Sequence, residues 1–215
     1  MSKVAIIGAS GFVGTQLTKE ALRRGHTVTA IVRNPEKVTI QDPHLSVVKG
    51  DVLHADQVEA LVKGQDVVLN AYNAGWENPR LYEDFIQASK AIQEGTRKAG
   101  VKRLLVVGGA GSLEIAPGVQ LVDTPEFPAQ WKTGALAARD YLNILKTEKD
   151  LDWTFLSPAI MLHPGERTGA YRTGKDNPVF NDKKESTISV EDLAVALLDA
   201  VDKHLHVKER FTVGY

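Results

Sequence analysis

The chain has 215 residues and no cysteine, and its 26 Lys and Arg residues nearly balance its 27 Asp and Glu residues, for a net charge of −1. This balance excludes the strongly basic surface that is typical of proteins that bind nucleic acids or anionic membranes. The lack of cysteine excludes disulfides, thiolate metal sites and cysteine nucleophiles, and it suits a cytoplasmic location. No apolar run reaches the ~18–20 residues of a membrane helix, and the first strand begins too early for a signal peptide. We therefore expect one soluble domain, residues 1–215, with no nucleic-acid or membrane partner, acting as a monomer or homodimer.

Short β-rich apolar runs alternate with helical repeats along the chain. The predicted strands are residues 3–8, 27–32, 45–48, 66–70, 103–107 and 153–156, with a late edge strand at 209–213. Helical spacing of apolar residues predicts helices after Gly11, around Val58, from Leu81 to Ile92 and around Leu142. Continuously apolar strands that alternate with helices indicate a parallel sheet buried on both faces.

The rhythm breaks between Pro158 and the last helix. Residues 158–188 are rich in proline, glycine and charge, which predicts a substrate-side excursion or lid rather than core. Ser189 and Asp192 have the spacing of a capping box at the start of a final helix.

A glycine-rich turn follows the first strand directly and opens the first helix. Gly8 permits the tight turn, Gly11 lets a pyrophosphate approach the backbone, and Gly14 lets the helix pack against the sheet. The amides of the same turn, including those of Ser10, Phe12 and Val13, would face the phosphates. The alternative is a turn that binds nothing. With the alternating elements, this motif predicts an α/β, Rossmann-type doubly wound, mostly parallel sheet with a small C-terminal substrate-side excursion.

The end of the second strand selects the dinucleotide. An acidic residue there would bind the ribose 2′-hydroxyl of NAD, but the sequence has Arg33, whose guanidinium suits a 2′-phosphate. We therefore expect NADP(H), with NAD(H) possible. The alternative is that Arg33 is a solvated charge at a strand end.

Polar residues after the third and fourth strands extend the expected cofactor site. Asp51, beside Val52, is a candidate acceptor for the adenine amino group, and Asn70, Ala71 and Tyr72 are candidates for the ribose and nicotinamide side. Ordinary turn chemistry explains these residues equally well. Gly108, which ends the fifth strand, is assigned to the same site.

Several motifs together carry a family resemblance. They are Gly8–Gly14, Val32-Arg-Asn-Pro35, Gly50-Asp51, the glycine-rich run 106–112, residues 152–158 and residues 164–169. With them the whole chain resembles the atypical short-chain dehydrogenase/reductases, near the NmrA-like and biliverdin/flavin reductase-like proteins often labelled NAD-dependent epimerase/dehydratase.

The resemblance implies a catalytic tyrosine and a lysine four positions later at the start of the helix that follows the fifth strand. In the matching register this chain has Trp131 and Ala135. Indole supplies no useful acid. Tyr141 has Leu145 four positions later, so the usual acid/base pair is missing and the catalytic residues stay unknown.

Weak catalytic candidates are Ser112, Trp131 and His163. Ser112 could donate to a substrate carbonyl, and His163 could donate a proton beside the possible anion clamp Arg167; the alternatives are ordinary loop residues. Lys132 is either a cation near the ribose or a surface charge. Trp76 and Tyr171 are pocket walls or core. No metal site is expected, since His204 and His206 have no third ligand nearby on their predicted strand.

Two functions remain open. The first is an NADP(H)-dependent oxidoreductase acting on a small carbonyl, quinone or flavin-like acceptor. The second is a non-catalytic NAD(P)-binding regulator or redox sensor, which the missing tyrosine and lysine favour. A sugar-nucleotide epimerase or dehydratase is a third option, but the region after Pro158 is short for a sugar-nucleotide domain.

Overall fold

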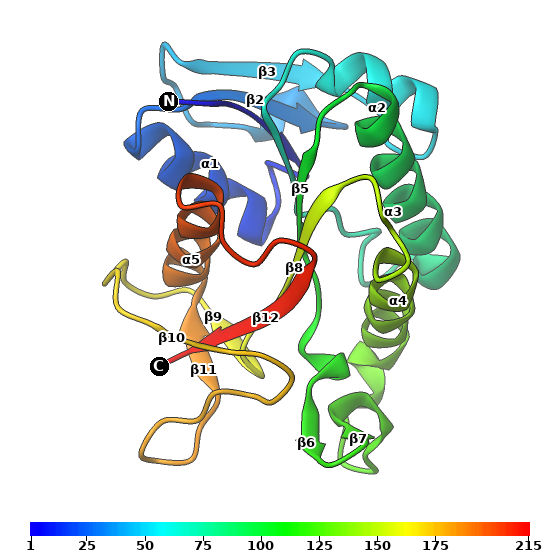
Figure 1. Ribbon diagram of the computed structural model, residues 1–215, viewed down its shortest axis with the longest axis vertical. Helices are drawn as coiled ribbons and strands as arrows, with labels where there is room; N and C mark the ends of the chain where they lie inside the picture. Colours follow the sequence, from blue (N-terminus) through cyan, green and yellow to red (C-terminus); the bar gives the residue numbers. More distant parts are fainter.

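A central twisted sheet organises the protein, and the computed structural model describes all residues 1–215 (Figure 1). The sheet has eight strands in the order β10-β12-β8-β5-β4-β1-β2-β3, and every neighbouring pair except β10–β12 is parallel. Its strands are β1 Lys3–Ile7, β2 Thr27–Val32, β3 Leu45–Lys49, β4 Val67–Asn70, β5 Arg103–Val107, β8 Asp152–Ser157, β10 Arg172–Gly174 and β12 Glu209–Gly214. The Rossmann-type doubly wound fold is thus confirmed, with the strand order reversing between β1 and β4.

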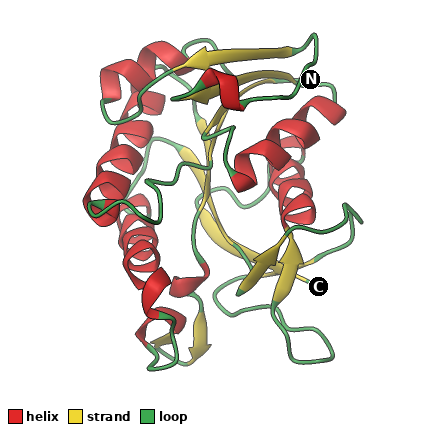
Figure 2. Cartoon of the chain, turned by 180° about the vertical axis from the view of Figure 1, so that it is seen from behind, coloured by secondary structure: helices red, strands yellow, loops and turns green.

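Helices cover both faces of this sheet, as Figure 2 shows from behind. They are α1 Phe12–Arg23, α2 Ala55–Val62, α3 Leu81–Lys98, α4 Ala129–Leu145 and α5 Val190–Asp202. Helices α1 and α5 pack together on one face, whereas α3 packs against both α2 and α4 on the other. Alternate residues of β1 divide between two cores: Val4 and Ile6 face α1 and α5, and Ala5 and Ile7 face the other layer. Burial on both faces is why the strands are continuously apolar.

The C-terminal third differs from expectation in two respects. β12 is not the edge strand, because β10 pairs outside it in antiparallel orientation. Part of the segment 158–188 therefore belongs to the main sheet rather than to an excursion. The rest forms β9 Met161–His163, which pairs in parallel with β11 Thr187–Ser189, and connecting loops. A second small sheet, β6 Glu114–Ala116 with β7 Val119–Gln120, was not predicted.

The capping box at α5 is only half formed. Ser189 Oγ accepts from the Asp192 amide at 3.0 Å, as predicted. The reciprocal contact is missing, because the Ser189 amide donates to the Tyr215 hydroxyl instead. The buried Asp192 carboxylate accepts from Thr168 Oγ1, the Gly169 amide and the Tyr215 hydroxyl, so it fastens the loop before β10 and the last residue to α5.

Two remaining features concern histidines and membranes. His204 and His206 lie in a turn with φ of 51° and 56°, not on a strand, and no three acidic or histidine side chains cluster as metal ligands. No helix combines the length and the apolar character required to cross a bilayer.

Candidate functional site

The carboxyl ends of β1, β2, β4 and β5 meet where the strand order reverses. Residues at the ends of neighbouring strands are paired, such as Ile7 with Ile31 and with Asn70. Such a switch point is where doubly wound sheets bind ligands, because the loops on its two sides diverge and leave a crevice.

The three glycines of the first loop differ in how strongly the backbone requires them. Gly8 has a φ of +80°, and a Cβ there would lie 2.6 Å from the Ala71 carbonyl oxygen. A Cβ on Gly14 would lie 2.1 Å from the Gly8 carbonyl oxygen, so only glycine lets α1 pack so closely. By contrast, a Cβ on Gly11 would meet only the Gly8 oxygen, at 3.2 Å. The backbone packing therefore requires glycine at 8 and 14, and it leaves room for a side chain at 11.

The start of α1 presents unpaired amides. Gly11 N–H donates to the Gly8 carbonyl at 2.9 Å, and the first helical bond runs from Thr15 N–H to Gly11 O. The amides of Ser10, Phe12 and Val13 donate to no backbone carbonyl, and no side chain caps the helix. Donors of this kind, together with the positive end of the helix dipole, suit a diphosphate. A dinucleotide pyrophosphate thus fits the cradle that Gly11 leaves open.

The ends of β2 and β3 flank this loop. Arg33 follows β2 directly, is exposed, and takes part in none of the ion pairs of the protein. Asp51 is also exposed, and its Oδ1 accepts from the Leu53 amide at 3.0 Å, while Val52 is buried in the core. The Asp51 contact is the ordinary turn hydrogen bond that was the alternative to adenine binding. It uses only Oδ1, so the second carboxylate oxygen takes no part in the turn.

The end of β4 combines a turn with an accessible phenol. Asn70 is buried and accepts from the Tyr72 amide at 2.9 Å. Burial raises the pKa of Tyr72, while the charge of Arg33 lowers it and those of Asp84 and Asp51 raise it. Arg33, Asp51 and Tyr72 follow the carboxyl ends of β2, β3 and β4, which lie at the same edge of the sheet. This phenol stays protonated at neutral pH and is a hydrogen-bond donor.

The loop after β5 is held tightly against α4. A Cβ on Gly108 would lie 1.9 Å from the Phe155 ring, and Gly111 and Gly109 pack against Ala135 and Ala138 respectively. The Gly108 requirement therefore comes from the packing of Phe155. Ser112 is buried, and Arg210 Nη1 lies 3.4 Å from its hydroxyl, so that side chain is turned toward β12.

The first turns of α4 carry no acid/base pair. Trp131 is 43% exposed and makes an edge-to-face pair with Trp76 at 4.7 Å. Ala135, one turn further along, packs on Gly111. Tyr141 is fully buried, and burial raises its pKa strongly, so it cannot exchange a proton with a substrate.

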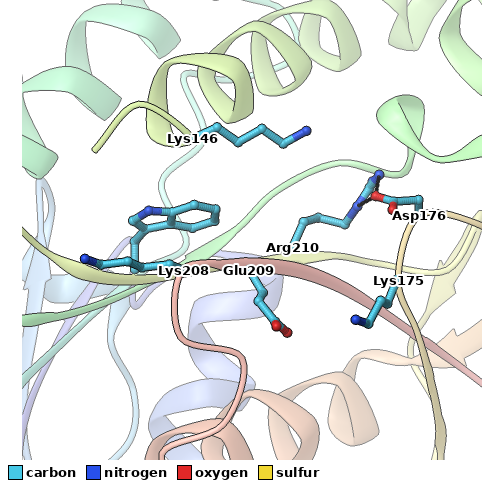
Figure 3. Close-up of a pocket in the computed structure, with 7 residues that line it drawn as sticks. Lys146, Lys175, Asp176, Lys208, Glu209 and Arg210 are labelled. Atoms are coloured by element: carbon cyan, nitrogen blue, oxygen red, sulfur yellow. Dashed lines mark hydrogen bonds and ion pairs between the residues drawn. The ribbon is translucent and has the colours of Figure 1, made fainter. Parts of the chain in front are cut away.

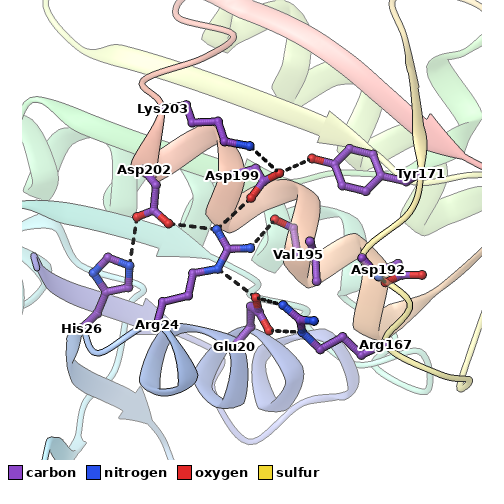
Figure 4. Close-up of polar contacts among 11 residues, drawn as sticks. Glu20, Arg24, His26, Arg167, Tyr171, Asp192, Val195, Asp199, Asp202 and Lys203 are labelled. Atoms are coloured by element: carbon purple, nitrogen blue, oxygen red, sulfur yellow. Dashed lines mark hydrogen bonds and ion pairs between the residues drawn. The ribbon is translucent and has the colours of Figure 1, made fainter.

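Two candidate residues of the 158–188 segment, Arg167 and Tyr171, bind helices α1 and α5 (Figure 4). Arg167 donates from Nε and Nη2 to the buried Glu20 carboxylate at 2.7 and 2.9 Å. The Tyr171 hydroxyl donates to Asp199 Oδ2 at 2.7 Å, near the end of α5. Arg167 and Tyr171 thus attach the segment to the α1–α5 layer, and neither is the anion clamp or pocket wall expected from the sequence.

His163 is also engaged. Its Nδ1 lies 2.9 Å from the Pro164 carbonyl oxygen and its Nε2 lies 2.9 Å from Thr187 Oγ1. Both ring nitrogens therefore have partners within the same segment.

A separate shallow cleft of about 350 Å³ lies near the amino ends of β8 and β12 (Figure 3). Its lining includes Lys146, Lys175 and Lys208, and its Arg210 and Asp176 are paired at 2.6 Å. This cleft contains none of the residues predicted for the cofactor, and it lies toward the opposite ends of the strands.

One residue beside Trp76 was not predicted from the sequence to matter. Gly134 lies inside α4, and a Cβ there would be 2.6 Å from Trp76 Cζ3. A glycine inside a helix costs roughly 1 kcal/mol relative to alanine, and that cost was the available signal.

Comparisons with known proteins agree with the fold and identify the family. A sequence model of the NAD(P)H-binding family matches residues 8–204. The uncharacterized protein YwnB of Bacillus subtilis is 43% identical over 98% of this chain and 97% of its own.

Solved structures of similar proteins cover the whole chain. A candidate epimerase of Bacteroides thetaiotaomicron is 48% identical, with a TM-score of 0.93 over 97% of that chain. A candidate NADH-flavin reductase of Streptococcus pneumoniae is 36% identical, with a TM-score of 0.85 over 99% of that chain.

Proposed function

Because this chain belongs to the NAD(P)H-binding family, we propose that it is an NADP(H)-dependent oxidoreductase acting on a small conjugated acceptor such as a quinone or flavin. One observation carries the proposal. The Gly8–Gly14 turn presents the unpaired amides of Ser10, Phe12 and Val13 at the carboxyl end of β1, next to the strand that Arg33 follows.

The residues divide the binding task among them. The amides of Ser10, Phe12 and Val13 hold the pyrophosphate, and the guanidinium of Arg33 pairs with the 2′-phosphate. The second oxygen of Asp51 accepts from the adenine amino group, and the Tyr72 hydroxyl donates toward the nicotinamide ribose. The bound cofactor supplies the hydride, which is the difficult part of the chemistry.

The proton balance explains the choice of acceptor. A hydride and one proton together reduce a quinone to its hydroquinone, or an oxidised flavin to its dihydroflavin. The reduced quinone or flavin is a weakly basic anion that solvent can protonate, whereas the alkoxide of a simple carbonyl requires a positioned acid. Since Trp131 and Ala135 stand where the tyrosine and lysine would, an acceptor of the first kind fits this site.

The first test measures the preference for NADP(H). Titration of wild type with NADPH and NADH should show tighter binding of NADPH, and Arg33→Ala should reduce that preference about tenfold or more, as expected for a lost charge-assisted contact of ~1.5–3 kcal/mol. Arg23→Ala is a matched control, because Arg23 is exposed at the far end of α1. An unchanged affinity ratio in Arg33→Ala would show that Arg33 does not bind the 2′-phosphate.

A second candidate function follows from the missing acid/base pair. A protein that binds NADPH tightly and oxidises it with no quinone, flavin or aldehyde is a cofactor-binding regulator rather than an enzyme. Steady-state NADPH oxidation across such a panel separates the two functions. The cytoplasmic location and the choice between monomer and homodimer stay predictions, which cell fractionation and sedimentation would test.

A further inference from the structure

Trp76, in the loop after β4, and Trp131, in the first turn of α4, form an exposed aromatic corner. Their side chains are 52% and 43% exposed, and their rings meet at 81° with centroids 4.7 Å apart. Removing the apolar surface of an indole from water is favourable, so an exposed indole gains when another group covers it. In an edge-to-face pair, a ring face stays open to solvent.

The corner is held rigidly. Asn73 accepts from the Gly75 amide at 2.7 Å, and Asn78 Nδ2 donates to the Ala74 carbonyl and to Asp84, so the loop that carries Trp76 is fastened on both sides. Gly134 makes room for the Trp76 ring, since any larger residue there would displace it. The chain thus accepts a helix-destabilising glycine to seat a side chain that is half in solvent.

The position of the corner points to the reacting end of the cofactor crevice. The loop with Trp76 starts at Ala71, whose carbonyl packs on Gly8 of the phosphate turn. Trp131 lies on the same side of α4 as Ala135 and Ala138, which pack on the loop after β5. The two indoles therefore come from the elements that follow β4 and β5, on the side of the switch point away from Arg33.

Resting on the function proposed above, we propose that Trp76 and Trp131 are the binding surface for the acceptor, and that the acceptor is a planar conjugated ring that stacks on an exposed indole face. Stacking selects a flat ring of any substitution, because every such ring has a π-face. A small aliphatic aldehyde offers no such face and gains nothing from the corner. A second copy of this chain is the alternative occupant, and the test below distinguishes it.

The experiment uses riboflavin as the probe and needs no cofactor. Riboflavin fluorescence is quenched when the ring stacks on indole, so a titration with protein gives a dissociation constant directly. Trp76→Leu and Trp131→Leu should each raise that constant about tenfold, as expected for a lost aromatic pair. Trp131→Phe keeps a ring and should stay within about threefold of wild type. NADPH affinity should be unchanged in all three variants.

Two further variants control for folding and for exposure. Gly134→Ala keeps both tryptophans in the sequence but displaces the Trp76 ring, so it should weaken riboflavin binding as Trp76→Leu does. Phe180→Leu removes another exposed aromatic residue, 46% exposed beside the edge strand β10, and should change nothing.

The outcomes separate this proposal from the function on which it rests. Tryptophan-dependent riboflavin binding without NADPH oxidation would overturn the enzyme function and support the aromatic corner. Absent riboflavin binding, or equal binding by all variants, would overturn the corner as an acceptor site even if NADPH is oxidised. A dimer that the leucine variants dissociate, with riboflavin binding unchanged, would assign the corner to a second copy and overturn the proposal as well.

Discussion

Replacing Gly11 by alanine should separate cofactor binding from stability. The backbone at Gly11 has a φ of −82°, which alanine adopts freely, and the added Cβ would meet only the Gly8 oxygen, at 3.2 Å. Alanine is a poorer N-cap than glycine by up to ~1 kcal/mol. Alanine also makes the unfolded chain less flexible, which stabilises the folded state by ~0.4–1 kcal/mol, so the two effects offset each other. We expect a melting temperature within about 3 °C of wild type.

The same methyl group would occupy the cradle that a pyrophosphate needs. Pushing the phosphates away from one charge-assisted amide bond costs ~1.5–3 kcal/mol, or about tenfold to a hundredfold in the dissociation constant of NADPH. Isothermal titration calorimetry with NADPH measures this constant, and circular dichroism during heating measures the melting temperature.

Gly14→Ala is the matched comparison. Its Cβ would lie 2.1 Å from the Gly8 oxygen and 2.8 Å from Ala9 Cα, and backbone atoms cannot move aside as a flexible side chain can. We expect a loss of ~1–3 kcal/mol in the free energy of unfolding and a melting temperature lower by about 3–10 °C. If folded Gly11→Ala binds NADPH as tightly as wild type does, the pyrophosphate does not lie on this turn and the reasoning is refuted.

Three other predictions concern the polar contacts that hold the layers together. Burial raises the pKa of Glu20, but hydrogen bonds from Arg167 and Arg24 bring it below its ordinary value of 4.5. These contacts therefore contribute their full stability above pH 4.5, and the contribution is lost as the pH falls from 4.5 through the lowered pKa. Glu20→Gln should flatten the acid limb of a plot of unfolding free energy against pH, and an unchanged acid limb would contradict this. Arg103 is buried and donates to three carbonyl oxygens and a threonine hydroxyl. Arg103→Leu should therefore lower the unfolding free energy by about 2–5 kcal/mol in urea titrations. A loss smaller than the error of the titration would show that other groups satisfy those acceptors. Tyr215→Phe removes one of three donors to the buried Asp192 carboxylate and should cost about 1–3 kcal/mol in the same assay, whereas no change would mean that water replaces the phenol.

Local sequence patterns determined most of the fold. Continuous apolar runs such as Val4–Ile7 need cover on both faces, which in turn requires helices between successive strands. The spacing of Gly8, Gly11 and Gly14 after the first strand predicted the turn into α1, because the positive φ of Gly8 and the contact of Gly14 with the Gly8 carbonyl arise within a few residues of chain. The predicted strands β1 to β5 and β8 and all five helices are present for these reasons.

Contacts between distant segments decided the rest. Arg167 pairs with Glu20 across 147 residues of sequence, and no local pattern predicts that partner. β10 is three residues long, so its apolar pattern carries almost no signal, and only the exposed edge of β12 makes it a strand. The aromatic corner likewise depends on a contact between Gly134 of α4 and Trp76, which lies in the loop before α3.

The sequence by itself thus determined the main sheet and its helices and predicted the glycine-rich turn after β1, because those follow from periodicity and from glycine conformation over a few residues. Only the tertiary structure decided which polar side chains face the crevice and which join the layers. That division depends on which side chains lie beside a buried charge in the folded protein, and separation along the chain does not reveal this.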